Sequence, residues 1–350
     1  MARTNYGIPY KGSKNMIAEW VVSHVPECGT FFDVFAGGCA VTDCILRKGL
    51  AGHVVANDID PMPLKCFEMA VRGEFADEDR WISREAFFML KDTDPYVRFC
   101  FSFGNNTKDY MYSTTIEPYK RSIHYVLVHD YWDDFNRLCP EVCSDCRCAL
   151  NGVNDRKARR IAFQQVFTNR IKELSGDNWC APIVQGNPLY RSVKTKKPKR
   201  GLVAGDNDMH LENVIALQSL LSLERLQNIE SLQSLERLEP ALETSNLDYR
   251  ALTERILTTD RAFVYCDPPY LGTQGYGEFD YDEFFDWVLE IGHKHPVLIS
   301  EYAIDHDGFV EVNSKLKLSC FSVNGSKVVD EKLYTVKGGV GLDGSFNRDL

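Results

Sequence analysis

Two stretches far apart in the chain repeat one order of elements: a short buried strand, a helix and a second strand. Strands joined through a helix lie parallel in one sheet, with right-handed crossovers. The strands are predicted over residues 31–35, 53–58, 262–266 and 296–300, and the helices over 41–50 and 281–291. The sequence therefore predicts an α/β fold with a mostly parallel central sheet.

The stretch between these halves has a different texture, of mixed polarity and with a basic segment. A length of 350 residues suits about two domains, or one large domain with an insertion. We predict one domain from residues 1–75 and 245–350, which holds the repeated strand and helix order, and an inserted, largely helical domain over 76–205. A leucine-rich, repeat-like segment over 206–244 joins them.

The leucine-rich segment holds an internal repeat in which Leu or Ile recurs at every third residue from 217 to 238. Its Leu, Gln, Glu and Arg residues favour a helix. A period of three drifts ~60° per step around an α-helix, so it builds no stable apolar face. An irregular, solenoid-like stack of strands and a helix that is covered on several sides therefore both fit the repeat as well.

Charge is distributed unevenly along the chain. The net charge is −10, yet residues 147–200 hold 13 Lys and Arg against three acidic residues. A basic segment in an acidic protein indicates an electrostatic footprint for a polyanion such as nucleic acid. Its two densest clusters, the predicted DNA-binding residues, are Arg156, Lys157, Arg159 and Arg160, and Lys194, Lys196, Lys197, Lys199 and Arg200.

The predicted strand over 262–266 is followed by Asp267-Pro268-Pro269-Tyr270. Two prolines fix an extended exit from the strand and present Asp267 and Tyr270 at the carboxyl edge of the sheet, where open α/β folds bind ligands. Asp267 and the Pro268 carbonyl would accept the two N–H bonds of an adenine amino group while Tyr270 stacks on the ring. We predict Asp267, Pro268 and Tyr270 as catalytic residues; the alternative is a Pro-Pro turn with a surface aspartate.

A glycine turn follows the first predicted strand. Asp33 lies near the end of that strand, and Gly37-Gly38 would let the backbone pass close to a ligand. Asp58 ends the next strand, 21 residues after Gly37, a position that suits ribose hydroxyls. The dinucleotide pattern GxGxxG is absent.

A basic loop near the N-terminus reads Tyr10-Lys11-Gly12-Ser13-Lys14. The full phosphate-binding string GxxxxGK[ST] is missing. A lysine paired with a ligand carboxylate is the better interpretation, and a plain surface loop is the alternative.

The ordered set PYKGSK, DVFAGG, NDID and CDPPY resembles the Dam family of DNA adenine-N6 methyltransferases. The order of the motifs is similar to that of the alpha group of amino-methyltransferases, and the FSFGNN stretch at 101–106 resembles a segment of phage-type members. The resemblance covers roughly residues 5–75 and 245–305. It implies a Rossmann-like catalytic domain, an inserted target-recognition domain and S-adenosylmethionine as the methyl donor.

The same resemblance implies roles for single residues. Tyr10 and Lys14 would contact the methionine part of the cofactor, Phe35 and Gly37 would line its pocket, and Asp58 would hold the ribose. Asn246-Leu247-Asp248-Tyr249 resembles the segment that holds the cofactor adenine. The expected cofactor-binding set is Tyr10, Lys14, Asp33, Phe35, Gly37, Asp58, Asp248 and Tyr249. Cys39 departs from the family pattern FxGxG, in which its position is a glycine.

We therefore expect a site-specific enzyme that flips adenine out of double-stranded DNA and methylates its N6 amino group directly. An RNA adenine methyltransferase and a catalytically inactive DNA-binding relative are the alternatives. The resemblance leaves open a partnership with a restriction endonuclease, and the oligomeric state.

The composition also predicts the cellular location of the protein and the state of its cysteines. No apolar run approaches the ~20 residues that cross a bilayer, and the first residues carry no apolar core of a secretion signal, so we expect a cytoplasmic protein without a membrane partner. Its 12 cysteines should then be thiols. Four of them crowd into residues 139–148, where free thiols are a better interpretation than a zinc site, so no metal is expected.

Overall fold

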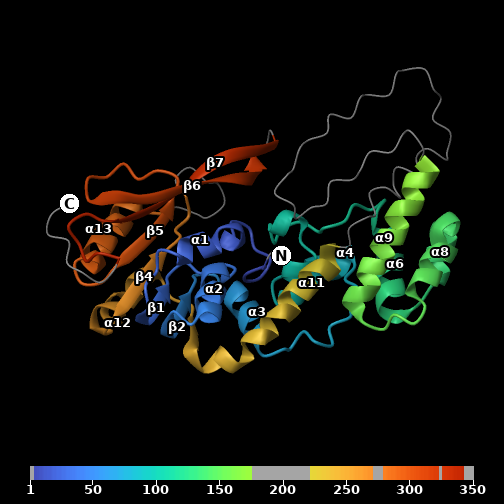
Figure 1. Ribbon diagram of the computed structural model, residues 1–350, viewed down its shortest axis with the longest axis horizontal. Helices are drawn as coiled ribbons and strands as arrows, with labels where there is room; N and C mark the ends of the chain where they lie inside the picture. The colour runs from blue at the N-terminus through green and yellow to red at the C-terminus, as the bar shows by residue number, and fades with distance from the viewer. Residues whose placement is uncertain (1–3, 176–220, 271–278, 323–324, 343–350) are drawn as a thin grey trace, which may run out of the picture. The chain divides into compact units, whose positions relative to one another are not determined.

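The computed structural model describes residues 4–175, 221–270, 279–322 and 325–342 (Figure 1). It divides into two compact units. Unit 1 comprises residues 1–76, 228–323 and 327–350, and unit 2 comprises residues 77–227 and 324–326.

Unit 1 is built on a seven-stranded sheet with the order β3-β2-β1-β4-β5-β7-β6. The pairs from β3 to β5 are parallel, whereas β7 pairs antiparallel with β5. The strands are β1 (Cys28–Asp33), β2 (Ala51–Asn57), β3 (Leu242–Ser245), β4 (Ala262–Cys266), β5 (Val297–Glu301), β6 (Phe309–Ser322) and β7 (Gly325–Val336). The fold is thus α/β with a mostly parallel sheet, as the sequence predicts.

Helices cover this sheet, and α3 and α13 each begin at a capping aspartate. Asp60 caps α3 through the Met62 N–H, and Asp280 caps α13 through the Glu283 N–H. The helical elements of unit 1 are η1 (Lys14–Met16), α1 (Ala18–Val22), α2 (Ala40–Lys48), α3 (Pro61–Val71), η5 (Tyr249–Leu252), α12 (Thr253–Thr258) and α13 (Tyr281–Gly292). The predicted strands and helices are all present, with ends shifted by a few residues.

The main core lies between the sheet and the helices η5, α12 and α13. Alternate residues of β4 and β5 enter it, such as Val264 and Ile299, and they pack on the apolar face of α13 with Phe284 and Val288. The intervening side chains are buried as well, as the stacked rings of Phe31 and Phe263 show. Burial on both faces explains why these strands are continuous apolar runs.

Unit 2 is largely helical over its described residues. Its helices are α4 (Arg84–Leu90), α5 (Pro95–Cys100), η2 (Phe103–Asn105), α6 (Glu117–His129), α7 (Asp133–Leu138), α8 (Pro140–Leu150) and α9 (Arg156–Ser175), and α11 (Leu221–Glu230) begins within it. An aromatic cluster packs in this unit: Trp81 stacks on Tyr112 and meets Phe101 edge-on.

Over residues 221–241 the leucine-rich segment adopts two helix types in succession, and its residues 206–220 lie outside the described ones. Residues 221–230 form α11, and residues 231–241 form the 3₁₀-helix η4 (Ser231–Ala241). A 3₁₀-helix has 3.0 residues per turn, so residues three apart lie on one face. Leu232 and Leu235 are accordingly buried, and η4 packs against α3. The helix expected for this segment is thus present over its described residues, and the repeat of three matches the period of η4.

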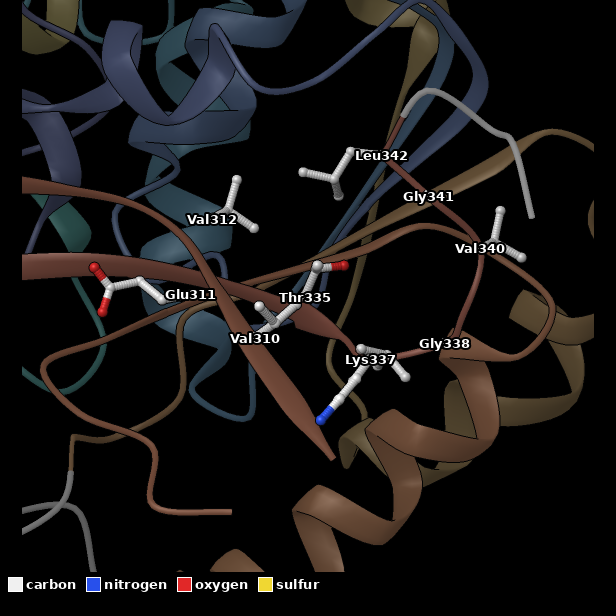
Figure 2. A pocket seen from close by; sticks show the side chains of 10 residues that line it. Val310, Glu311, Val312, Thr335, Lys337, Gly338, Val340, Gly341 and Leu342 are labelled. Carbon is white, nitrogen blue, oxygen red and sulfur yellow. The ribbon is translucent and has the colours of Figure 1, made fainter. Parts of the chain in front are cut away.

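Two further features concern the surface of the chain. Within the described ranges, no helix combines the length and the apolar character needed to cross a membrane. A cavity of about 400 Å³ lies against β6, β7 and residues 337–342, with Val310, Val312 and Leu342 among its lining residues (Figure 2).

Candidate active site

The carboxyl ends of β1 and β4 meet at the middle of the sheet. Strand order runs outward in opposite directions from this pair, which makes it the topological switch point where open α/β sheets bind ligands. Asp33 is the last residue of β1 and pairs in register with Tyr265 of β4. Asp267 follows two residues later, so the two predicted site aspartates lie at the same edge.

Lys14 and Asp267 form a close ion pair at this edge. Lys14 Nζ lies 2.6 Å from Oδ1 and 2.6 Å from Oδ2 of Asp267. The Lys14 side chain is 6% exposed and that of Asp267 is 17% exposed. The lysine thus holds the carboxylate of Asp267 in one orientation.

A second carboxylate, Glu331 of β7, completes this cluster. Glu331 Oε1 lies 3.4 Å from Lys14 Nζ and also accepts the hydroxyl of Tyr270. The Tyr270 ring lies under the lysine, with Nζ 4.7 Å from the ring centroid, and meets the Tyr302 ring edge-on. Sequence reasoning predicted three members of this cluster, and it missed Glu331 and Tyr302.

Charge and burial set the protonation of the cluster. Burial alone would lower the pKa of Lys14, but the negative charges of Asp267 and Glu331 outweigh it and hold that pKa above its usual value. Burial, with the same two carboxylates, raises the pKa of Tyr270 well above its usual value. Lys14 is therefore an ammonium and Tyr270 a hydroxyl donor at neutral pH.

The glycine turn after β1 brings Tyr10 and Asp58 together. Gly37 has a φ of 46°, and its N–H donates to Asp58 Oδ2 at 2.8 Å. A Cβ on Gly37 would lie 2.9 Å from Cε1 of Tyr10, and one on Gly38 would lie 2.6 Å from Cβ of Tyr10. Only glycines let the ring of Tyr10 lie this close to the turn.

Cys39 occupies the position at which the family pattern has its last glycine. Its φ of 58° and ψ of 30° lie in the left-handed region, directly before α2. Non-glycine residues adopt this conformation at a cost. Cys39 is fully buried, and its thiol approaches the Gly37 carbonyl at 3.8 Å. The loop thus keeps a glycine-like backbone although it has a side chain there.

Asp33 is a buried carboxyl with one oxygen in use. Its Oδ2 accepts the backbone N–H of Thr42 at 3.2 Å and the Thr42 hydroxyl at 2.7 Å. Its Oδ1 is buried without a hydrogen-bond partner among the described residues. Burial raises the pKa of Asp33 to about 7, with a further contribution from the charges of Asp267 and Asp58 and against the hydrogen bonds from Thr42.

Asp58 lies just beyond β2 and already holds part of the backbone. Its Oδ1 accepts the Asp60 N–H at 2.9 Å, while Oδ2 accepts the Gly37 N–H. Burial raises its pKa, and these two bonds oppose that shift. A carboxylate has about four acceptor sites, so it retains capacity for two hydroxyl groups.

The segment after β3 gives its two candidate residues different environments. Tyr249 is buried, and its ring lies 5.7 Å from that of Phe35. Asp248 caps η5 through the Arg250 N–H and pairs with the Arg250 guanidinium, which lowers its pKa. Phe35 and Tyr249 therefore form an aromatic wall near the end of β1, while Asp248 is held by Arg250.

The basic cluster at the start of α9 is largely engaged within unit 2. Arg159 donates to the carbonyls of Val126 and Leu127 at the end of α6. Arg160 Nη1 lies 2.7 Å from Glu224 Oε1, and Arg156 donates to the Glu78 carbonyl. Lys157 is exposed. Charge arithmetic does not show these internal partners, which engage all three arginines within unit 2.

The other sequence features give no further site in the described residues. The second basic cluster, residues 194–200, lies outside them. Cys139, Cys143 and Cys146 are buried free thiols and Cys148 is an exposed one, all at α8 or its start. No group of three or more metal-ligating side chains occurs among the residues that the structure describes. The cavity of Figure 2 is lined by neither Asp267 nor Lys14.

The sheet order, with its switch point between β1 and β4, is consistent with a Rossmann-like methyltransferase fold. Residues 10–140 match the family model of the D12 class N6 adenine-specific DNA methyltransferases. The matched span includes the Tyr10–Lys14 loop, the glycine turn and Asp58, and it supports a Dam-like DNA adenine methyltransferase. No curated protein matches the chain.

Proposed function

We propose that the chain transfers the methyl group of S-adenosylmethionine to N6 of adenine in double-stranded DNA. The target base leaves the duplex, and the methyl group moves directly to its amino nitrogen. The observation that carries this proposal is the position of Asp267 at the end of β4, beside the end of β1, where its carboxylate is fixed by Lys14.

The proposal gives Asp267 the role of aiming the amino group. The lone pair of that nitrogen is delocalised into the adenine ring, so it is a poor nucleophile until its N–H bonds are oriented. Asp267 and the Pro268 carbonyl would accept those bonds. The aromatic ring of Tyr270, held by its hydroxyl and by Tyr302, supplies a face for stacking.

Other residues at the same edge fit the cofactor. Asp33 Oδ1 is a buried acceptor without a described partner, and Asp58 retains acceptor capacity for ribose hydroxyls. Phe35 and Tyr249 offer an aromatic wall to an adenine ring, and Tyr10 covers the Gly37 turn. When bound, S-adenosylmethionine supplies an electrophilic methyl group on its sulfonium sulfur.

Lys14 and Asp248, two of the predicted cofactor-binding residues, already have partners within the fold. Asp267 and Glu331 already surround the ammonium of Lys14, which favours a role in holding Asp267 over one in binding the methionine carboxylate. Asp248 is paired with Arg250, so Tyr249 is the stronger candidate in that segment.

Recognition of the duplex rests on the basic segment. N6 of adenine is base-paired in a duplex, so direct methylation requires the base to flip out. We assign phosphate contacts to Lys157 and to residues 194–200, because phosphate contacts supply most of the salt-dependent affinity. A cytoplasmic location is an expectation from the sequence, which leaves a paired restriction endonuclease open.

The test is methylation with a labelled donor of three matched substrates: unmethylated genomic duplex DNA, the same DNA as single strands, and RNA. Nucleoside mass spectrometry then identifies the product. The proposal expects N6-methyladenine from duplex DNA. If only RNA is methylated, the protein is an RNA adenine methyltransferase. If the protein does not bind S-adenosylmethionine, it is an inactive DNA-binding relative. Fluorescence of 2-aminopurine placed at a methylated site tests base flipping.

A further inference from the structure

Glu331 is a fully buried carboxylate that contacts two members of the candidate active site. It lies on β7, where the neighbouring Lys332 pairs in register with Glu301 at the end of β5. Its Oε1 accepts the Tyr270 hydroxyl and lies 3.4 Å from Lys14 Nζ. No motif of the sequence points to it, and it lies outside the matched residues 10–140.

A carboxylate at this position is costly. Removing a charge from water is unfavourable unless it is paired and hydrogen-bonded, and here one ammonium faces two carboxylates. A glutamine would fill the same volume and still accept the Tyr270 hydroxyl without a second buried negative charge. The charge of Glu331 is therefore best explained by what it does to Lys14.

The contacts of Glu331 act on two groups that would both hold the target base, the Asp267 carboxylate and the Tyr270 ring. Through Lys14 it acts on Asp267, which is the acceptor for the target amine in the proposed function. Through the Tyr270 hydroxyl it acts on the ring that would stack on the base. Tyr302 meets that ring at a centroid distance of 4.5 Å, so the hydroxyl bond and this contact together fix the ring plane.

We propose that Glu331 is a positioning residue for methyl transfer, holding Lys14 against Asp267 and fixing the plane of the Tyr270 ring. This inference rests on the proposed function and deepens it. Glu331 itself touches neither the cofactor nor the base. Its loss should therefore slow the chemical step more than it weakens the binding of either ligand.

The central variant is Glu331→Gln, which keeps the shape and the acceptor but removes the charge. Single-turnover methylation of duplex DNA should fall about 10- to 100-fold, because small misplacements of reacting groups carry costs of this size. The dissociation constants for DNA and for S-adenosylmethionine should change less than about threefold. The matched control is Glu311→Gln, which removes an exposed glutamate paired with Lys332 on the same hairpin and should leave the rate unchanged.

A pH profile separates positioning from a merely structural role. The groups that face Lys14 Nζ are Asp267, Glu331, Tyr270 and Tyr302. With Glu331 neutral, Lys14 loses one of the two charges that hold its proton, so its pKa falls. Glu331→Gln should then lose activity at an alkaline pH at which the wild type is still active, whereas Glu331→Asp should restore part of that activity.

Tyr270→Phe tests the second contact and does not depend on the folding of the glutamate variants. It removes only the hydroxyl that donates to Glu331 and should slow transfer with DNA affinity retained. Because both residues act on one ring, the double variant Glu331→Gln with Tyr270→Phe should lose less than the product of the single losses.

The outcomes distinguish this inference from the proposed function. A wild-type protein that makes no N6-methyladenine contradicts the proposed function. The role of Glu331 is overturned, and the proposed function kept, if the wild type is active and Asp267→Ala is inactive while Glu331→Gln and Tyr270→Phe both react at the wild-type rate. Slower transfer by Glu331→Gln with an unshifted pH profile and parallel losses of DNA and cofactor affinity also overturns it, because that pattern indicates a general structural defect.

Discussion

Lys14 Nζ lies 2.6 Å from both carboxylate oxygens of Asp267, although 253 residues separate the two along the chain. Lys14 is the first residue of η1, just before α1, and Asp267 follows β4 at the middle of the sheet. The ion pair therefore joins the two sequence halves in which the motifs were found.

Replacement of Lys14 by methionine should destabilise unit 1. The change leaves the charges of Asp267 and Glu331 buried without their shared cation, a loss that costs about 3–5 kcal/mol in comparable pairs. Thermal unfolding measures the effect, with Lys65→Met on the exposed face of α3 as the control. Adding Glu331→Gln to Lys14→Met should restore part of the lost stability. Equal melting temperatures for wild type and Lys14→Met would contradict the burial of this pair.

Replacement of Asp58 should weaken the binding of S-adenosylmethionine. Loss of hydrogen bonds from ribose hydroxyls to a charged acceptor costs about 1.5–3 kcal/mol, or roughly 10- to 150-fold in affinity. Asp58→Asn is preferred to Asp58→Ala because an amide oxygen can still accept one of the backbone bonds from Gly37 and Asp60. Isothermal titration gives the cofactor affinity, and DNA binding without cofactor should stay near wild type. An unchanged cofactor affinity would show that another group holds the ribose.

Cys39 offers a test of the turn between β1 and α2. Its φ of 58° suits glycine, so Cys39→Gly relieves backbone strain, whereas Cys39→Ala removes the thiol and keeps the strain. We expect Cys39→Gly to be more stable than Cys39→Ala by about 1 kcal/mol. Urea unfolding of the two variants measures the difference. A more stable alanine variant would show that the turn is not left-handed at this residue.

Asp33 should make stability depend on pH. The pKa of the folded protein is about 7 because of burial, whereas an unfolded aspartate titrates near 3.9. The folded state therefore binds the proton more tightly, and its stabilising effect is complete below about pH 4 and lost as the pH rises to about 7. Asp33→Asn imitates the protonated form at every pH. Relative to wild type it should gain roughly 4 kcal/mol between about pH 4 and about pH 8. If the difference in unfolding free energy between Asp33→Asn and wild type does not change with pH, the Asp33 carboxyl is exposed to solvent rather than buried.

Much of the site could be predicted because its residues follow buried strands. The apolar runs of β1 and β4 fix where Asp33 and Asp267 emerge, and two parallel neighbours bring their carboxyl ends to one edge. The glycine turn was predictable for a similar reason, since Gly37 marks the close approach of Tyr10. These features depend on local pattern and on one pairing of strands.

Other features depend on partners that a sequence does not display. Glu331 lies in a strand of mixed polarity, and only the antiparallel addition of β7 beside β5 brings it to Lys14. Arg159 and Arg160 read as a phosphate-binding cluster, yet carbonyls of α6 and the side chain of Glu224 engage them. A charge count identifies cations without showing which of them already have a partner in the fold.

The leucine repeat shows a third limit. Its period of three matches a 3₁₀-helix, which is rarely longer than a few residues and is therefore a poor expectation from sequence. The packing of Leu232 and Leu235 against other parts of unit 1 outweighs the weaker hydrogen-bond geometry of η4. Tertiary burial, rather than helical propensity, decided the conformation of this segment.

The most direct measurement is the amount of N6-methyladenine formed in duplex DNA by wild-type protein and by Asp267→Ala. Without the carboxylate, one N–H of the target amine is not oriented. Transfer should therefore fall by about 10²-fold or more, while DNA affinity is retained through phosphate contacts. We predict that the wild-type protein methylates adenine, and that the Asp267→Ala variant binds DNA but does not methylate it. Methylation by Asp267→Ala at the wild-type rate would contradict the assignment of this site.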